Sequence, residues 1–129
     1  MDDIDSKILY ILKKNGRENF VEIAKEIGIT EGTVRNRVGR LVKAGVIKRF
    51  TIDYEAPVEG LVILKSRLKN NRELIDKLKA FSDNIFEISG EYDIAAIIKA
   101  DSIEELNKKI DRIRALKSVI ATNTAIKLH

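Results

Sequence analysis

The amino-acid sequence predicts an α+β protein made of two small domains, and two different hydrophobic patterns predict it. Up to about residue 45, apolar side chains recur every three or four residues, which is the spacing of amphipathic helices. From residue 61 onward, short apolar strands alternate with two helical stretches. The only proline, Pro57, lies between the two patterns and favours a linker there. The predicted organisation is a first domain over 1–52, a linker over 53–60 and a second domain over 61–129.

Three helices are predicted in the first domain. Asp2 or Asp3 can cap the first helix, and the second runs roughly from Phe20 to Ile27. Gly28 then permits a sharp turn before the third helix. The segment VIKRFTID, 46–53, is predicted as a short strand pair or wing. The residues expected in the core are Ile4, Ile8, Ile11 and Leu12 of the first helix, Ile23, Ala24 and Ile27 of the second, Ile29, and Val34, Val38, Leu41 and Val42 of the third.

The second domain is predicted to follow the order βαββαβ, the split pattern of ferredoxin-like domains. This pattern places the first and third strands in the centre of the sheet, and these are also the most apolar strands. Helices can cover only one face of such a sheet, so the apolar residues of the other face are expected to lie inside a dimer. The strands are expected over 61–68, 85–89, 93–99 and 119–127. One helix is expected over 72–82, with Leu74, Ile75, Leu78 and Phe81 inward; the other starts at a Ser102–Glu105 capping box and carries Ile103, Leu106, Ile110 and Ile113.

Composition excludes several classes of chemistry. The chain has no cysteine, which excludes disulfides, thiolate zinc sites and cysteine nucleophiles, and its only histidine is His129. No cofactor and no metal site are therefore predicted. No apolar run approaches the roughly 18 residues of a membrane-spanning helix, and the acidic start MDDIDSKIL is unlike a signal peptide. The prediction is a cytoplasmic protein that does not enter a membrane, and its abundant Ile, Lys and Glu favour a thermophilic source.

Charge is concentrated around the third helix. The whole chain has a net charge of only +4, but between residues 30 and 49 six cationic residues stand against Glu31 alone. Such a patch indicates a polyanionic partner, whereas a merely solvated helix face usually mixes both signs. At 100° per residue, the face opposite the apolar stripe carries Gly32, Thr33, Asn36, Gly39, Arg40 and Lys43, with Arg35 and Arg37 on the flanks.

This division of faces is what a helix in the DNA major groove requires. Arg and Asn side chains can bond base edges bidentately, and glycines let the backbone approach the duplex. The alternative, a plain three-helix core, has no use for outward glycines that each cost roughly 1 kcal/mol relative to alanine. Thr30 and the helix N-terminus favour a phosphate, and the later cations favour backbone phosphates. The candidate residues for binding double-stranded DNA are Thr30, Gly32, Thr33, Arg35, Asn36, Arg37, Arg40, Lys43, Lys48 and Arg49.

Over Asp2–Leu128 the chain resembles the Lrp/AsnC family, the feast/famine regulators of bacteria and archaea. DDIDSKILYIL is similar to the first helix of that family, and EIAKEIGITEGTVRNRVGRLVKAGVIKRF to its helix-turn-helix and short wing. ISGEYDIAAII carries the Gly-x-Tyr-Asp signature of the effector domain, and VIATNTAIKL is similar to the closing strand. The resemblance implies a DNA-binding domain joined to an amino-acid-sensing domain. It also implies dimers that assemble into tetramers or octamers, with a small amino-acid effector bound between dimers.

Residue roles follow from this resemblance by position. Arg37 and Arg40 match recurrent recognition-helix arginines, and Thr30 occupies the usual Ser cap. On the residues alone, Asp93 offers an anionic partner for an α-ammonium group, but GEYD can equally be a plain hairpin with a solvated carboxylate. Threonines in the last strand can likewise reflect only strand propensity. The candidate effector residues are Gly90, Tyr92, Asp93, Thr122 and Thr124.

Three functions compete at this point. The first is a transcription regulator of amino-acid metabolism that responds to a small amino acid. The second is an architectural DNA-binding protein without an effector, whose specificity comes from bending the duplex. The third is an enzyme, because some tetrapyrrole decarboxylases resemble the same two-domain architecture. Those enzymes look dependent on histidine near the substrate, and this chain has no internal histidine, so the sequence predicts a protein that is not an enzyme.

Overall fold

The computed structural model describes residues 1–67 and 69–128, and it divides into two compact units, Met1–Tyr54 and Glu55–His129. Leu68, the expected last residue of a strand, and His129 lie outside the described residues. Each unit is described by itself. Among the described residues, no helix is both long and apolar enough to span a bilayer.

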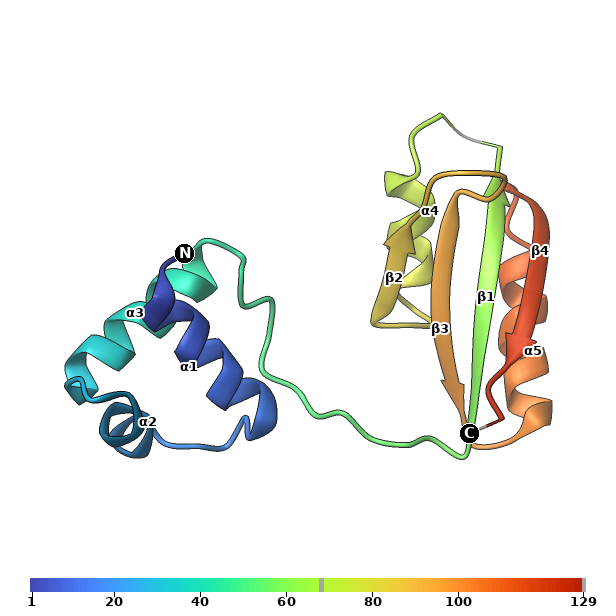
Figure 1. Cartoon of the computed structure of the whole chain (residues 1–129). Coiled ribbons are helices and arrows are strands. Elements are labelled where there is room, and N and C mark those ends of the chain that lie inside the picture. Colours follow the sequence, from blue (N-terminus) through green and yellow to red (C-terminus); the bar gives the residue numbers. More distant parts are fainter. Residues whose placement is uncertain (68, 129) are drawn as a thin grey trace. The chain divides into compact units, whose positions relative to one another are not determined.

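The first unit contains the three predicted helices: α1 (Asp3–Lys14), α2 (Phe20–Ile27) and α3 (Glu31–Lys43) (Figure 1). Each begins at a residue whose side chain accepts a hydrogen bond from the first turn. Asp2, rather than Asp3, caps α1 and forms a capping box with Asp5. Asn19 caps α2, and Thr30 caps α3 as expected.

The core of the first unit is small. Its central cluster contains five buried residues, Ile8, Ile23, Ala24, Val34 and Val38, and the other expected core residues of α1 and α2, together with Ile29, pack against them. Leu41 is also buried, but Val42 is 46% exposed, so its expected place in the core is wrong. At 100° per residue, Val42 lies about 80° from Val34, at the margin of the buried stripe.

Gly28 makes the turn between α2 and α3 in a left-handed conformation, with φ +84°. A side chain there would meet no atom within 4 Å, so the cost of replacing it comes from the backbone angle alone. We expect Gly28→Ala to destabilise the first unit by about 1–2 kcal/mol. Gly39→Ala is the matched control, because Gly39 lies inside α3 with equally open space around it. This variant should stabilise the first unit by up to about 1 kcal/mol. Denaturation midpoints that move in the same direction for both variants would contradict this account.

The expected strand pair over 46–53 is not formed. The described residues between α3 and Val58 contain no strand, and Ile47 alone among their apolar side chains packs against the core of the first unit. Phe50, Ile52 and Tyr54 are exposed. An isolated pair of short strands is marginal in water, and this segment has no third strand to support it.

The second unit is an antiparallel sheet with two helices on one face, as predicted (Figure 1). The strand order is β2-β3-β1-β4, so the first and third strands are central. Strand β1 begins at Val58 instead of Leu61, and α4 ends at Leu78 because the chain then turns through Ala80 and Phe81. The elements are β1 (Val58–Ser66), α4 (Arg72–Leu78), β2 (Asn84–Glu87), β3 (Ile94–Ala100), α5 (Ile103–Arg114) and β4 (Val119–Ile126).

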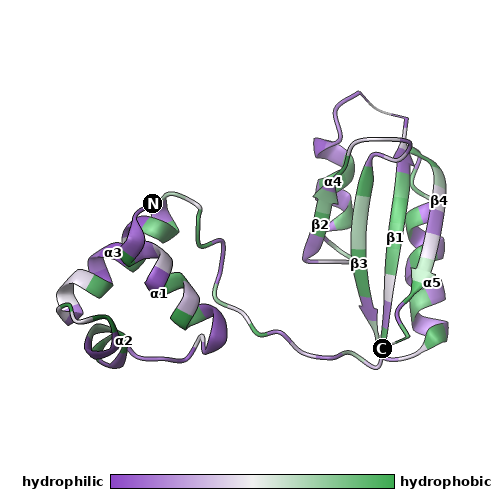
Figure 2. Cartoon of the chain, in the orientation of Figure 1, coloured by the Kyte–Doolittle hydropathy of each residue, from purple (hydrophilic) through white to green (hydrophobic). Residues whose placement is uncertain are grey.

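The core of the second unit lies between the sheet and its helices. Alternate residues of β1 and β3 are buried there with residues from α4 and α5, and Figure 2 shows how hydrophobic both central strands are. The other face of the sheet also carries apolar side chains: Leu61 pairs in register with Ile97, and Phe86 with Ala95. Leu61 and Phe86 are exposed. The sheet therefore has the open apolar face that the sequence predicts, and the dimer that would cover it stays a prediction.

Helix α5 differs from expectation at its start. Ser102 accepts a hydrogen bond from the Glu105 N–H at 3.1 Å, but the Glu105 carboxylate accepts from the Asp101 N–H and not from that of Ser102. The expected capping box is therefore only half formed. Ile103 is exposed rather than inward, because the first turn of α5 extends past the edge of the core formed by Leu106, Ile110 and Ile113.

Candidate DNA-binding surface and effector pocket

Helix α3 presents one face to the core of the first unit and the opposite face to solvent. Val34, Val38 and Leu41 are buried. The exposed face carries Gly32, Asn36, Gly39, Arg40 and Lys43. The helix therefore has the two faces that its sequence predicts, and the exposed one combines cations, an amide and two glycines.

The two threonines at the start of α3 bond each other. The Thr30 hydroxyl accepts a hydrogen bond from the Thr33 N–H at 3.2 Å, and the two hydroxyl groups lie 2.8 Å apart. Glu31 pairs with Arg35 one turn along the helix. The first turn is thus ordered by its own side chains, with the backbone N–H groups of the N-terminus directed out of the helix.

Arg37 lies on the flank of α3 that faces α1. Its guanidinium donates a hydrogen bond to the Asp2 carboxylate and lies 3.4 Å from Asp5 Oδ1. Its side chain is only 23% exposed. The same two carboxylates form the capping box of α1, so Arg37 joins α3 to the start of α1. This ion pair competes with the base-contacting role predicted for Arg37, and that role stays a prediction.

This contact makes stability depend on pH. The hydrogen bond from Arg37 holds the pKa of Asp2 below its ordinary value of 3.8. A carboxyl group whose pKa is lowered by folding stabilises the fold above its unfolded pKa, and that contribution disappears as the pH falls through the folded pKa. We therefore expect Asp2→Asn, which retains a good cap, to be less stable than the wild type at neutral pH, with a difference that shrinks as the pH falls below 3.8 and through the folded pKa of Asp2.

Urea denaturation at several pH values measures this difference. Asp3→Asn is the control, because Asp3 lies in the same turn but makes no ion pair among the described residues. A stability difference between Asp2→Asn and wild type that does not shrink as the pH falls from neutral to well below 3.8 would show that the carboxylate charge is irrelevant.

Arg40 and Lys43 differ from Arg37. Within residues 1–67 and 69–128, Arg40 and Lys43 make no ion pair, and both are exposed. Lys48 and Arg49 follow in the segment without regular structure and are exposed too. Asn36 and Arg40 are four residues apart and so lie one above the other on the helix surface.

The predicted effector residues lie in two places in the second unit. Gly90 and Tyr92 belong to the connection between β2 and β3, where Gly90 has φ +123°. The Asp93 carboxylate accepts a hydrogen bond from the Ser66 N–H at 2.7 Å. It is therefore not the solvated carboxylate of a plain hairpin, because one of its oxygens is bonded to the last residue of β1.

The two threonines of β4 face α5. Thr122 Oγ1 accepts a hydrogen bond from Arg114 Nε at 3.0 Å. Thr124 Oγ1 is buried and has no hydrogen-bond partner among the described residues. Thr124 also contributes to a pocket between α5 and β4, with a volume of about 390 Å³, which lies within the usual range for small-ligand sites. The pocket is lined by Asn107, Ile110, Asp111, Arg114, Thr124 and Ile126.

Sequence reasoning missed the α5 side of this pocket. Asp111 and Arg114 lie one turn apart on α5, with 3.5 Å between Asp111 Oδ1 and Arg114 Nη1. Polar residues at this spacing look like an ordinary solvated helix face. The only sequence signal was the alternation of Thr122 and Thr124, which marks one face of β4 but does not say which helix lies over it. Gly90, Tyr92 and Asp93 do not line this pocket within one copy of the chain.

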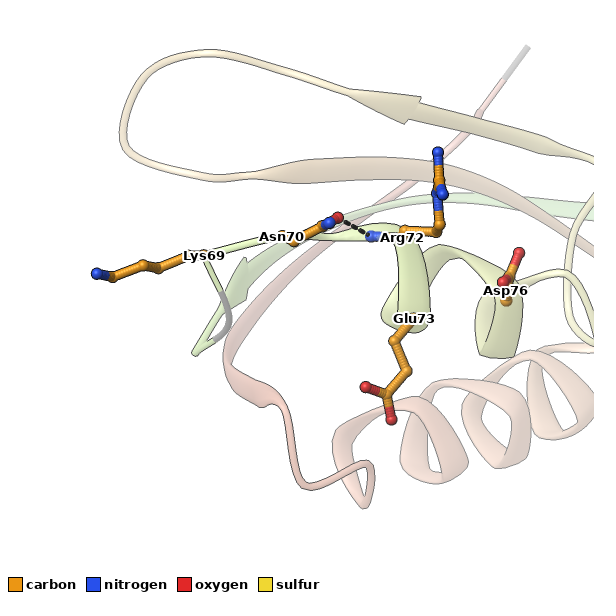
Figure 3. A pocket seen from close by; sticks show the side chains of 5 residues that line it. All are labelled: Lys69, Asn70, Arg72, Glu73 and Asp76. Carbon is orange, nitrogen blue, oxygen red and sulfur yellow. Dashed lines mark hydrogen bonds between the residues drawn. The ribbon is translucent and has the colours of Figure 1, made fainter.

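A second hollow lies where β1 leads into α4. Figure 3 shows that its lining side chains point in different directions, and the only hydrogen bond drawn joins Asn70 Oδ1 to the Arg72 N–H, at 2.9 Å. Lys69, Glu73 and Asp76 complete the lining. These groups do not converge on a common point, so the hollow offers no binding geometry. Nor does any group of three acidic or histidine side chains in the described part of the chain come together as a metal site.

Comparison with known proteins identifies close relatives. Residues 1–48 match the model for winged helix-turn-helix DNA-binding domains. The HTH-type transcriptional regulator LysM of Sulfurisphaera tokodaii is 41% identical over 100% of this chain and 96% of its own length. LysM of Saccharolobus solfataricus is 38% identical over 100% of this chain and 94% of its length. The solved structure of AsnC from E. coli superposes with a TM-score of 0.74 at 25% identity, covering 100% of this chain and 93% of that one.

Proposed function

Because this chain belongs to the Lrp/AsnC family of DNA-binding transcription regulators, we propose that α3 reads operator bases in the major groove and that a small amino acid controls this binding from the second unit. One observation carries the first half: Asn36 and Arg40 are exposed side by side on α3, and Arg40 makes no ion pair within residues 1–67 and 69–128. Arg and Asn are the side chains that bond guanine and adenine bidentately. The relatives are regulators rather than enzymes, so the enzyme alternative is dropped.

The other residues of the surface take positioning roles in this proposal. Lys43, Lys48 and Arg49 neutralise backbone phosphates. The N-terminus of α3, capped by Thr30, receives a further phosphate on its free N–H groups. Arg37 holds α3 at the angle at which its exposed face meets the duplex.

Selection of bound duplexes from a random pool, with and without a mixture of amino acids, tests this function. We expect enrichment of discrete half-sites about one helical turn, or roughly 34 Å, apart. Enrichment that changes when amino acids are present supports effector control. Recovery of the pool without any sequence preference would instead support the architectural alternative, in which bending rather than base contacts decides where the protein binds.

The effector half of the proposal places an amino acid in the pocket between α5 and β4. Asp111 would bind the α-ammonium group and Arg114 the α-carboxylate, since each carries the opposite charge. The buried hydroxyl of Thr124 lacks a partner among the described residues and would bond a further polar atom of the ligand. Regulation of amino-acid metabolism would follow from differential affinity of the effector for two states of the assembly.

Calorimetric titration with the common amino acids should detect at least one ligand. Arg114→Ala is expected to weaken that ligand roughly tenfold to a hundredfold, the effect of removing one charge-assisted hydrogen bond. Arg112→Ala is the matched control, because Arg112 is exposed on the same turn of α5 but does not line the pocket. Absence of heat across the whole panel would contradict the proposed sensing function. Equal losses of ligand affinity in both variants would contradict the assignment of the ligand to this pocket.

A further inference from the structure

Strand β4 forms an edge of the sheet that lacks the usual protection against pairing. Residues 119–126 read VIATNTAI and contain neither a charged residue nor a proline, the residues that natural edge strands use to avoid other strands. The opposite edge differs: β2 has only 4 residues, follows Asp83 and ends at Glu87. Figure 1 shows β4 along the outer side of the sheet. Of the two edges, β4 is the one suited to accept another strand.

The sequence of β4 reads the same in both directions. From Ile120 to Ile126 the order is Ile-Ala-Thr-Asn-Thr-Ala-Ile, with Asn123 at its centre. Two antiparallel copies centred on this residue oppose threonine to threonine, alanine to alanine and isoleucine to isoleucine. Lys127 would oppose Val119, so no like charges meet within the strand. This is the self-complementarity that a two-fold interface requires.

The backbone N–H and C=O groups of β4 point in the directions that this pairing requires. The Lys127 N–H donates to the Glu59 carbonyl at 2.9 Å, and hydrogen-bonded pairs alternate along an antiparallel ladder. With Asn123 opposite Ile63, the odd-numbered residues of β4 therefore direct their N–H and C=O groups toward β1. The N–H and C=O groups of Thr122 and Thr124 point away from β1, outward in the plane of the sheet. A pairing centred on Asn123 opposes these even-numbered residues to one another, as the hydrogen bonds require.

We propose that two copies of this chain join β4 to β4, antiparallel, on a two-fold axis through Asn123. Thr122 of each copy then exchanges backbone hydrogen bonds with Thr124 of the other, and the two sheets become continuous. Ile120 and Ile126, which are 53% and 45% exposed, meet across the new contact. The axis is perpendicular to the sheet, so the helices of both copies lie on one side and both open apolar faces stay accessible. The proposal does not depend on the effector pocket.

An engineered thiol tests the position of the axis, because the chain has no cysteine of its own. Asn123 of the two copies would form a non-hydrogen-bonded pair with Cα atoms about 4.5 Å apart, within the range that a disulfide spans. Asn123→Cys should therefore give a covalent dimer under mild oxidation. Ala125→Cys is the matched control: it is exposed on the same face, but the two copies of residue 125 would lie roughly 13 Å apart along the strands.

The result is scored on a denaturing gel without reductant. Cross-linking of Asn123→Cys but not of Ala125→Cys supports the proposal. Equal cross-linking of the two variants, or none in Asn123→Cys, overturns it.

Hydrogen exchange in the unmodified protein gives a second test that needs no variant. The N–H groups of Thr122 and Thr124 should be protected by at least about tenfold relative to the segment 48–56, because both are bonded only through the second copy. Exchange of these two amides at the rate of that segment would show that the edge is free and would overturn the proposal.

Discussion

Replacing Arg40 with alanine is expected to weaken binding to the selected duplex by roughly fivefold to 150-fold and to relax the preference at one base position. A bidentate contact between an arginine and a guanine discriminates against other bases by about 1–3 kcal/mol. Arg40 is exposed on the outward face of α3 and makes no ion pair in the described part of the chain, so its guanidinium needs no release before binding. Fluorescence anisotropy with the selected duplex and its single-base variants measures both effects.

Two controls separate base contacts from phosphate contacts. Lys48→Ala should lower the affinity for all duplex sequences alike and reduce the slope of log affinity against log salt by about one unit. If Arg37 positions α3 through Asp2 and Asp5, as we propose, Arg37→Ala should also leave the base preference unchanged. If Arg40→Ala lowers the affinity for the selected duplex and for random duplex by the same factor, base readout by this arginine is refuted.

Ile8→Ala is expected to unfold most of the first unit and to abolish DNA binding. Burial of Ile8 is complete, and it belongs to the cluster of five buried residues at the centre of this unit. Replacing a buried isoleucine by alanine costs about 2–5 kcal/mol, which is a large part of the stability of a domain this small. The second unit has a core of its own, so its secondary structure and its self-association should be retained.

Circular dichroism and DNA titration of the same sample check this expectation. Tyr10→Ala is the control, because Tyr10 is exposed on α1 and the Lys14 ammonium lies over its ring, 4.5 Å from the centroid. Loss of that contact should cost at most about 1 kcal/mol. An Ile8→Ala protein that binds DNA like the wild type would contradict the assignment of Ile8 to an essential core.

Local signals made most of the fold predictable. Helix α2 begins and ends at the expected residues because Gly28 stops it and the apolar period is regular. The order of strands and helices in the second unit, and the central places of β1 and β3, followed from the apolar runs and their turns. The family resemblance, drawn from motifs in both halves, is confirmed by relatives that align over the whole chain.

The misses share a non-local cause. The expected wing over 46–53 would need a partner strand that this segment does not have within one copy. Val42 lies at the margin of the buried stripe and Ile103 in the first turn of α5, and neither helix contains information on whether a neighbouring element reaches far enough to cover them. The pairing of Arg37 with Asp2 joins residues 35 positions apart, and periodicity within α3 contains no information about it.

The carboxylate of Asp93 links the turn after β2 to the edge of the sheet formed by β4. It accepts the N–H of Ser66, and Ser66 in turn is paired with Val119 at the irregular start of β4. A cation that binds this same oxygen of Asp93 would compete with that amide and so loosen the last residue of β1. Because Ser66 pairs with Val119, such binding would act on the residue of β1 that holds the start of the outermost strand.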